Sequence, residues 1–539
     1  MFSLSRRWAS GRSIEFGGNA RQLMLAGIER IATAVGVTLG PKGRNVIIRQ
    51  PDGEPKITKD GVTVARSIEF HNQFEDVGAK LIRQVANKTN DVAGDGTTTA
   101  TILAWSIFAE GYKSVTTGAN PMDLKRGIDA AVAIILDDLA EQTRPLKDLA
   151  MLENVATISA NGERPLGILI AQAVKAVGVS GFISVVDGNT TTTEWSKQDG
   201  WCIEHGFVSG ALMTDSTNLR SRLDNPLVFV TAQPLEAVQD VVRLLEGARA
   251  QRRPLVLIGP SFGKSVMQTV ILNHESGVVQ CGVVRVPELK EDELHDVALS
   301  CQCNVEKVSF VSYVDDVKCL LGSAKYMEQT MDNTVVCGTG DTTAGVRLLQ
   351  SQLERLMTEE SREAMRERIS KLNNTYAVIR VGGRSAIEVN ESKDRVVDAL
   401  NASRNALVEG IVAGGGAALL HASKKLDELL LHDEEMGQDR RTGIQIVRNA
   451  IRLPLKKISE NAGEEGAVTV ENVAEYQETT MGYDAQNNKY VDMFEAGIVD
   501  PVRVVRSCVV DAASVAGLMI TTEASVCDYH SIPDKHRKG

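Results

Sequence analysis

The chain has 539 residues, 43% of them hydrophobic and 24% charged, which is long enough for about two to four folded domains. Lysine and arginine number 59 against 70 aspartates and glutamates, and the resulting net charge of −11 disfavours nucleic-acid binding by phosphate neutralisation. No stretch approaches about 18 uninterrupted apolar residues, so a membrane span is not expected.

The first ten residues, MFSLSRRWAS, contain Arg6, Arg7 and three serines but no acidic residue. This composition resembles a short organelle-import presequence, which we expect at residues 1–13. The alternative is a start that carries two arginines by chance. The eight cysteines include no CxxC pair, and the lone Cys301/Cys303 pair favours reduced thiols over a metal site. A reducing compartment fits this cysteine usage.

The first third of the chain has helical periodicity. Asn120-Pro121 is typical of a helix start, with a capping residue followed by proline at the first helical position. One apolar face then repeats every three or four residues, through Leu124, Ile128, Val132, Ile135 and Leu139. A short α/β segment follows, with a helix in RPLGILIAQAVKAVG and a strand in FISVV.

The pattern changes near residue 199. Apolar strand-like runs, PLVFV, PLVLI and VVQCGVVRV, alternate there with helical segments, which predicts a separate α/β domain. A charged helix is expected at about 343–372, and after YAVIRV the chain returns to long helices. We therefore predict a mostly α fold with an inserted α/β domain, in which the two outer parts of the chain pack together.

Three glycine-rich segments are candidates for a phosphate site. GPSFGKS (259–265) follows a strand and precedes a helix, but its spacing is one residue too short for a P-loop, so a strand–helix turn is favoured. VAGGGAALL (412–420) permits either close approach to a flat group such as a nucleotide base or a tight turn between two elements.

The third segment is AGDGTTTAT (93–101). Asp95 offers a carboxylate for Mg²⁺, and the amides and hydroxyls of Thr97, Thr98 and Thr99 would gather at a helix N-terminus, where phosphate is favoured. The alternative is an ordinary capping turn. VTLGPKGRNV (37–46), with two cations, and ITKDGVTVA (57–65), with Asp60 in a turn, add to the phosphate interpretation.

Taken in order, TLGPKGRNV, ITKDGVTVA, AGDGTTTAT, VAGGGAAL, IVDP (498–501) and AASVAGLMITTE (512–523) resemble a group I chaperonin of the mitochondrial and bacterial kind. The resemblance covers residues 14–526 and implies the three-domain chaperonin fold. It implies an equatorial ATPase domain (14–141 and 409–526), an intermediate domain (142–198 and 377–408), an apical domain (199–376) and a flexible tail (527–539).

The resemblance also implies an ATP site with Mg²⁺ and K⁺ as cofactors. Asp95 would bind Mg²⁺, Asp60 would position the attacking water, and Asp398, from the intermediate domain, would activate it. The residues implied to hold the nucleotide are Thr38, Leu39, Gly40, Pro41, Gly96, Thr97, Thr98, Thr99, Gly415, Asp484, Ala485, Ile498 and Asp500.

In the apical domain the family binds unfolded chains in an apolar groove. The matching positions are Phe207, Leu212, Val242, Leu245, Met267, Ile271 and Leu272, each of which is equally typical of a helix core. The sequence departs from the family pattern at Asn374-Thr375, which replaces a glycine pair at a hinge of the apical domain. Outside the apical domain, NALVEGIVAGGG places Asn405 and Val408 off pattern. These departures put the handling of clients, rather than the ATP chemistry, in doubt.

The resemblance implies an ATP-dependent chaperone in the mitochondrial matrix. Its expected partners are unfolded polypeptides, a small co-chaperonin lid and further copies of the chain in a seven-fold ring, with neither nucleic acid nor membrane. The alternative is a divergent structural or regulatory subunit of a mixed ring that binds clients weakly.

Overall fold

The computed structural model describes residues 12–49, 55–146, 148–178, 183–188, 190–203, 205–214, 220–286, 291–306, 317–330, 333–340, 343–353, 375–432 and 437–528, with single positions 308, 311, 365, 368 and 369. The expected presequence lies outside this set except for Arg12 and Ser13, and the expected tail lies outside it beyond Asp528. Strand β1 (Arg12–Phe16) pairs antiparallel with β19 (Ala524–Asp528). The pairing extends two residues beyond the boundaries expected at 14 and 526.

Contacts divide the chain into two compact units. Unit 1 consists of Met1–Gln172, Asp187–Glu194 and Arg380–Gly539, and unit 2 consists of Ala173–Val186 and Trp195–Ile379. Unit 2 is therefore inserted between two outer parts that fold together, as the change of pattern near residue 199 predicted. The segments expected to form an intermediate domain fall mostly within unit 1.

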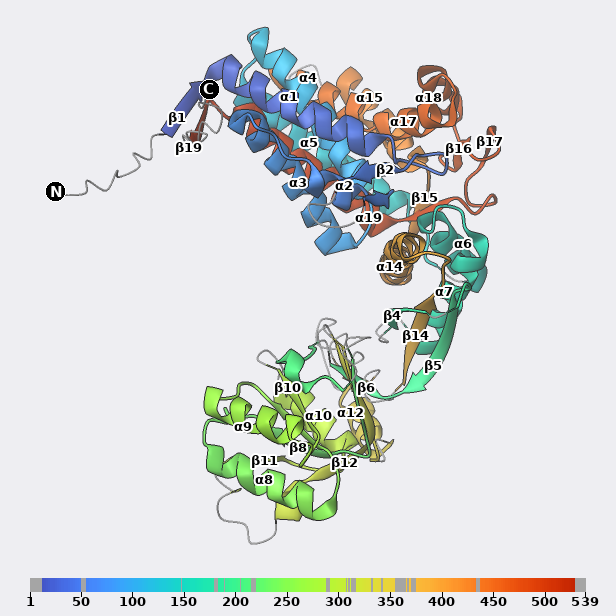
Figure 1. The fold of residues 1–539 in the computed structure, drawn as a ribbon. Coiled ribbons are helices and arrows are strands. Elements are labelled where there is room, and N and C mark those ends of the chain that lie inside the picture. The colour runs from blue at the N-terminus through green and yellow to red at the C-terminus, as the bar shows by residue number, and fades with distance from the viewer. Residues whose placement is uncertain are drawn as a thin grey trace, which may run out of the picture. The chain divides into compact units, whose positions relative to one another are not determined.

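Unit 1 is mainly helical, and Figure 1 shows its blue N-terminal helices beside its orange and red C-terminal helices. Its helices in the first part of the chain are α1 (Gly17–Gly36), α2 (Gly61–Ser67), α3 (Gln73–Ala93), α4 (Thr97–Thr116), α5 (Pro121–Gln142), α6 (Leu149–Ser159) and α7 (Arg164–Val177), the last of which continues into unit 2. Those in the last part are α14 (Ala386–Glu409), α15 (Ala417–His432), α16 (Gln438–Ala450), α17 (Leu453–Ala462), α18 (Gly466–Glu475) and α19 (Val502–Thr521).

Short two-stranded sheets complete unit 1. Besides β1–β19, antiparallel pairs are formed by β2 (Val46–Ile48) with β3 (Lys56–Thr58), β15 (Ile411–Ala413) with β18 (Val499–Pro501), and β16 (Met481–Asp484) with β17 (Lys489–Asp492). The β15–β18 pair joins the glycine-rich segment after Ala413 to the IVDP segment, with Val412 opposite Asp500.

The helix starts and apolar faces follow the sequence signals. Asn120 caps α5 by accepting a hydrogen bond of 3.0 Å from the N–H of Met122, and Pro121 is the first helical residue. On the predicted apolar face, Leu124, Ile128, Ile135 and Leu139 are buried, and Val132 is half-buried. This face packs into the main core of unit 1 with α4, α15, α16 and α19.

Helix α19 is the one described helix that is long and apolar enough to cross a membrane. However, 61% of its most apolar window is buried within the protein, where it packs against α3, α4 and α5. Its apolar surface therefore belongs to the core of unit 1.

Unit 2 contains an eight-stranded mixed sheet. Along its main path the order is β10 (Cys281–Arg285), β9 (Leu255–Gly259), β8 (Leu227–Thr231), β12 (Gly322–Gln329), β13 (Thr334–Gly338) and β6 (Trp201–Ile203), while β11 (Val305–Glu306) pairs with β8 and β7 (Ser221–Asp224) pairs with β12. A second, three-stranded sheet has the order β4 (Ile183–Asp187), β14 (Thr375–Val381), β5 (Glu194–Asp199).

Helices cover both faces of the larger sheet. Leu227 and Phe229 of β8 point into a core with α8 (Val238–Gln251) and α9 (Lys264–Glu275), whereas Val228 and Val230 point into a core with α10 (Glu291–Ser300) and α12 (Thr343–Leu353). The remaining described elements are the 3₁₀ turns η1 (Gly210–Leu212) and η2 (Val317–Leu320). The expected charged helix is described only as α12, since most of residues 354–374, Asn374 among them, lie outside the described set.

Candidate functional site

A cleft of about 440 Å³ in unit 1 is lined by segments from both ends of the chain. The first part of the chain contributes the turn after α1, the start of α2, the α3–α4 loop and the end of α6. The last part contributes α14, the β15–α15 junction and the segments around β16 and β18. The predicted ATP-site residues all line this cleft: Thr38, Leu39, Gly40, Pro41, Asp60, Asp95, Gly96, Thr97, Thr98, Thr99, Asp398, Gly415, Asp484, Ala485, Ile498 and Asp500.

Two left-handed glycines shape the loop at AGDGTTTAT. Gly94 (φ +64°) ends α3 and donates its N–H to the carbonyl of Asn90 at 2.7 Å, and Gly96 (φ +83°) immediately precedes α4. Residues with a Cβ adopt this backbone region only at a cost, so glycine is favoured at both positions. The chain thereby passes from one long helix to the next within three residues, and Asp95 lies between them.

The threonines form the first turn of α4. Its first backbone N–H groups have no acceptor within the helix, and the helix dipole places partial positive charge at this end. Thr98 Oγ1 lies 3.5 Å from Thr38 Oγ1 of the opposite wall. This arrangement offers donors to a phosphate.

Several carboxylates line the cleft, and their negative charges repel one another. The pKa of Asp398 is raised well above its ordinary value, first by loss of water contact and then by repulsion from Asp95, Asp60 and Asp394. The pKa of Asp95 is also raised, mainly by desolvation, although hydrogen bonds from Gly96 and Ser159 oppose this change.

Desolvation and repulsion from Asp95 raise the pKa of Asp500, which also lines the cleft, to about 7, against an opposing hydrogen bond from the N–H of Gly415. Asp484 is engaged in its own turn, where Oδ1 accepts from the N–H groups of Gln486 (2.9 Å) and Asn487 (3.2 Å). Asp484 thereby fixes the β16–β17 turn beside Ala485.

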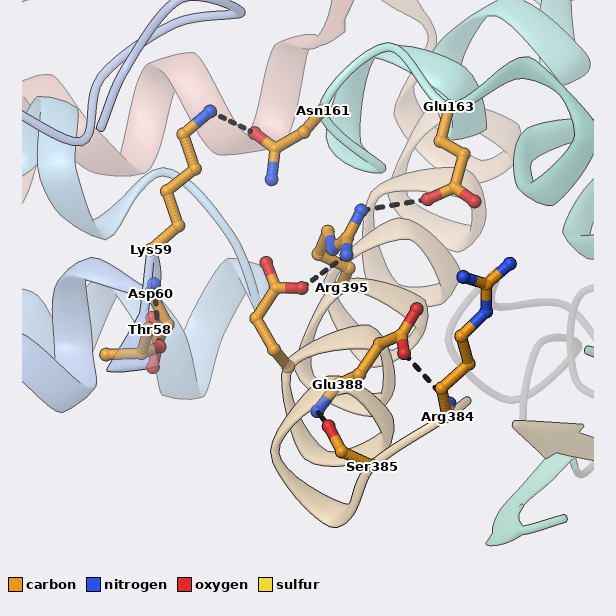
Figure 2. A network of polar contacts seen from close by, with 10 residues as sticks. Thr58, Lys59, Asp60, Asn161, Glu163, Arg384, Ser385, Glu388 and Arg395 are labelled. Atoms are coloured by element: carbon orange, nitrogen blue, oxygen red, sulfur yellow. Dashed lines mark hydrogen bonds and ion pairs between the residues drawn. The ribbon is translucent and has the colours of Figure 1, made fainter. Parts of the chain in front are cut away.

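Two cations, Lys59 and Arg395, line the same cleft. Lys59 Nζ donates to the carbonyl of Gly40 at 3.1 Å. It also donates to Oδ1 of Asn161 at 3.3 Å (Figure 2). Burial lowers the pKa of Lys59, partly offset by the attraction of Glu391. Arg395 pairs with Glu163 at 2.8 Å and with Glu391, so both cations are held by neighbours at the rim of the site.

The helix that carries Asp398 has a well-defined start. Ser385 caps α14 by accepting from the N–H of Glu388 at 3.2 Å, and the carboxylate of Glu388 accepts from the N–H of Arg384 at 2.8 Å (Figure 2). These two hydrogen bonds fix the first turn of α14 and resemble a capping box, except that Glu388 accepts from the residue before the N-cap. Asp60 has a similar structural role at α2, where its carboxylate accepts from the N–H groups of Val62 and Thr63, both at 3.0 Å.

The carboxylates of the cleft suit a magnesium ion that takes its remaining ligands from phosphate and water. Among the described residues, no group of three His, Cys, Asp or Glu side chains is arranged as a complete metal site. Mg²⁺ in phosphate-binding proteins commonly uses one or two carboxylates together with phosphate oxygens and water. Asp95, at the N-terminus of α4 and destabilised by its acidic neighbours, fits such a role.

The apolar groove expected in unit 2 is only partly exposed. Leu272 on α9 is 66% exposed, and Phe207, Val242, Met267 and Ile271 are half-buried. Leu212 and Leu245 are instead buried among α8, α9 and the sheet. The expectation that these two side chains line an open groove is therefore wrong for this structure. GPSFGKS is a turn between β9 and α9, as favoured over a P-loop.

The polar residues of the cleft that sequence reasoning missed include Lys59, Ser159, Asn161 and Arg395. Lys59 directly precedes Asp60 in ITKDG, so its place in a suspected site motif could have identified it. Ser159 and Asn161 lie in TISANG, and Arg395 lies one turn before Asp398; neither stretch has a distinctive pattern.

Comparisons with known proteins agree with this geometry. The model of the TCP-1/cpn60 chaperonin family matches residues 31–251 and 265–528. The chain is 45% identical over 539 residues to the mitochondrial chaperonin HSP60 of Trypanosoma cruzi, covering 98% of this chain and 96% of that protein. It is 46% identical over 538 residues to the mitochondrial chaperonin CPN60 of Euglena gracilis, covering 97% and 94%.

A solved structure has the same fold. The chaperonin gp146 of the Pseudomonas aeruginosa bacteriophage EL, crystallised in the presence of ATP-BeFx, matches with a TM-score of 0.73 at 21% identity, covering 95% of this chain and 98% of that one. The three-domain chaperonin fold predicted from the sequence is thereby confirmed. The chain belongs to the TCP-1/cpn60 chaperonin family as a group I member of the mitochondrial type, and it is a molecular chaperone.

Proposed function

We propose that the chain is an ATP hydrolase of the mitochondrial matrix that uses Mg²⁺ and ATP to drive the folding of unfolded or imported polypeptides. The observation that carries the proposal is that Asp398, from the last part of the chain, lines the same cleft as the AGDGTTTAT loop. Ring assembly and polypeptide clients are properties of the chaperonin family. A seven-fold ring of this chain and a small co-chaperonin lid belong to the proposal.

The residues divide the work of phosphoryl transfer. The N–H groups and hydroxyls of Thr97, Thr98 and Thr99 would hold the phosphates at the start of α4, and Asp95 would hold the metal. Magnesium, when bound, supplies neutralisation of the charge on the phosphates. Asp398 would orient a water molecule and accept its proton, with Asp60 as its neighbour on the opposite wall.

Other lining residues of the cleft suit a nucleoside. Gly415 permits close approach of the backbone, and Ala485 and Ile498 add apolar surface beside Asp484 and Asp500. The early segment Thr38–Pro41 lies on the cleft wall as well. Potassium stays a prediction of the family resemblance.

The proposal is tested with the purified full-length protein. ATP turnover is measured with and without Mg²⁺, and suppression of aggregation is measured with a chemically denatured client. We expect Asp398→Ala to lower turnover by roughly a hundredfold or more. The matched control is Val397→Ala, which changes an exposed neighbour on α14 and should preserve turnover. Unchanged turnover in Asp398→Ala would contradict the mechanism.

The same experiment separates the two functional hypotheses. A protein that hydrolyses ATP and protects the client is the proposed foldase. A protein that hydrolyses ATP without protecting any client would instead be a structural or regulatory subunit of a mixed ring. The foldase is favoured because relatives that are 45% and 46% identical over nearly the whole chain are named mitochondrial chaperonins.

A further inference from the structure

Asn405 lies on the same face of α14 as Asp398. Positions three and four residues apart are neighbours on a helix surface, so Asp398, Asn401 and Asn405 form one line along α14. The residues at the junction between α3 and α4 lie along this line and run in the opposite direction to α14. Asp398 is close enough to Asp95 to be repelled by it, Asn401 lies against Gly94, and Asn405 reaches Ala93.

The contact between Asn401 and Gly94 is tight. A Cβ added at Gly94 would lie only 2.4 Å from Nδ2 and 2.5 Å from Cβ of Asn401. The backbone at the end of α3 therefore rests directly on α14. A small displacement of either segment would change the position of Asp398 relative to Asp95.

Asn405 makes the polar link between these two segments. Its Nδ2 donates a hydrogen bond of 2.6 Å to the carbonyl oxygen of Ala93, and the two residues are only 8% and 2% exposed. Ala93 is the last residue of α3, so its carbonyl has no donor four residues later within the helix. Because the carbonyl oxygen can only accept, the amide of Asn405 must present its nitrogen.

We infer that Asn405 is a positioning residue whose hydrogen bond to Ala93 sets the register of α14 on the α3–α4 loop and so holds Asp398 beside Asp95. This inference rests on the proposed function, because it gives Asn405 a part in the reaction of Asp398. It also gives a purpose to a residue that departs from the family pattern in NALVEGIVAGGG. The adjacent Ala402 and Ala406 are fully buried but have no side-chain donor.

Loss of this hydrogen bond should affect turnover more than ATP binding. The residues proposed to hold the nucleotide lie on other elements, whereas Asp398 depends on the placement of α14. Misplacement of a reacting group by about 1 Å can cost up to about a hundredfold in rate. We expect Asn405→Ala to lower kcat on the order of tenfold while the KM for ATP stays within about twofold.

The test compares four variants of the assembled full-length protein at saturating Mg²⁺. Asn405→Ala removes the donor, Asn405→Leu removes it while keeping the volume, and Asn405→Gln keeps an amide that can partly restore the bond. Ser403→Ala is the control, because its buried hydroxyl bonds only the carbonyl of Ala399 within α14, at 2.6 Å. Assembly is checked by analytical ultracentrifugation, and the Leu variant replaces the Ala variant if the latter does not assemble.

The outcomes separate the inference from the proposed function. A lower kcat, an unchanged KM and partial recovery of kcat in Asn405→Gln support the inference. Kinetics of Asn405→Ala and Asn405→Leu equal to those of Ser403→Ala, or an equal loss through KM alone, overturn it. Asp398→Ala is measured in parallel: if its turnover is unchanged, the proposed function fails, whereas a loss there without any effect at Asn405 rejects only the positioning role.

Discussion

Ser159 donates a hydrogen bond of 2.9 Å from Oγ to Oδ2 of Asp95, and so joins the end of α6 to the loop between α3 and α4. The other oxygen of Asp95 accepts from the N–H of Gly96 at 2.5 Å. Both bonds favour the ionised carboxylate, whereas desolvation favours the neutral acid and raises the pKa. The hydrogen bonds from Ser159 and Gly96 therefore oppose the larger effect of burial on the pKa of the proposed metal ligand.

Replacing Ser159 by alanine should weaken the binding of Mg²⁺. Without the hydroxyl, the pKa of Asp95 rises further and its carboxylate is less fixed. We expect the Mg²⁺ concentration for half-maximal ATP turnover to rise about tenfold, with little change in kcat at saturation. Thr157→Ala is the control, since that hydroxyl bonds the carbonyl of Glu153 within α6. An unchanged Mg²⁺ requirement would refute the role of Ser159.

Alanine at Gly96 should disrupt both stability and ATP binding. The residue has φ +83°, and an added Cβ would lie 2.6 Å from Cγ1 of Val504 and 2.7 Å from Sγ of Cys508. We expect a loss of about 2–4 kcal/mol in the free energy of unfolding. Gly118→Ala is a matched control, because Gly118 has φ +105° but no atom within 4 Å of an added Cβ. Equal losses in the two variants would show that the steric contact is unimportant.

The unliganded protein should become more stable when Asp500 is replaced by asparagine, and the gain should depend on pH. The folded-state pKa of about 7 exceeds the ordinary value of 3.8, so the folded state binds the proton more tightly than the unfolded state. This carboxylate therefore lowers stability progressively as pH rises from about 4 to about 7, with little further change above that range. Thermal unfolding of Asp500→Asn should show little gain near pH 4 and the full gain at pH 8.

The upper limit of that gain is about 4 kcal/mol, from a shift of three pKa units at about 1.4 kcal/mol each. Asparagine can still accept the hydrogen bond from Gly415, so the substitution isolates the charge. A gain that is equal at both pH values would contradict the assigned ionisation.

Replacing Lys59 by methionine should weaken ATP binding. The substitution keeps most of the stem but removes a partly buried cation from the cleft wall and its bond to the carbonyl of Gly40. The lost positive charge lies in the cleft proposed to hold the phosphates of ATP, so we expect the Kd for ATP to rise on the order of tenfold in a calorimetric titration. The control is Lys42→Met, which removes an exposed cation that is close to Lys59 in the sequence. Similar Kd values for the two variants would exclude a direct role of Lys59.

Local sequence signals predicted much of the fold. Asn120-Pro121 identified the start of α5, and the spacing from Leu124 to Leu139 identified its buried face, because both depend on neighbours within the same helix. The strand–helix alternation of unit 2 was predicted for the same reason. The cleft residues were found through the motifs around Asp60 and Asp95, which lie in turns whose glycines are visible in the sequence.

Local sequence signals could not predict contacts between segments that are distant in the sequence. Ser159 lies in an ordinary helical sequence, and its importance arises only because α6 ends beside Asp95. Asn405 was noted as unusual, but its partner Ala93 offers a backbone carbonyl, which leaves no trace in side-chain patterns. Leu212 and Leu245 could not be assigned to core or surface, since apolar residues of a helix or turn serve either purpose.

The antiparallel pairing of β1 with β19 has a consequence for biogenesis. Arg12 finds its partner only when Asp528 has been synthesised, and the cleft likewise needs α14, β16 and β18 from the last part of the chain. Contacts so distant in sequence close slowly, because a long loop must be ordered first. The apolar faces of the helices that precede unit 2 and pack against the last part of the chain therefore stay exposed until that part has been synthesised. A newly made copy should depend on holding factors during that interval and gain affinity for ATP only at its completion.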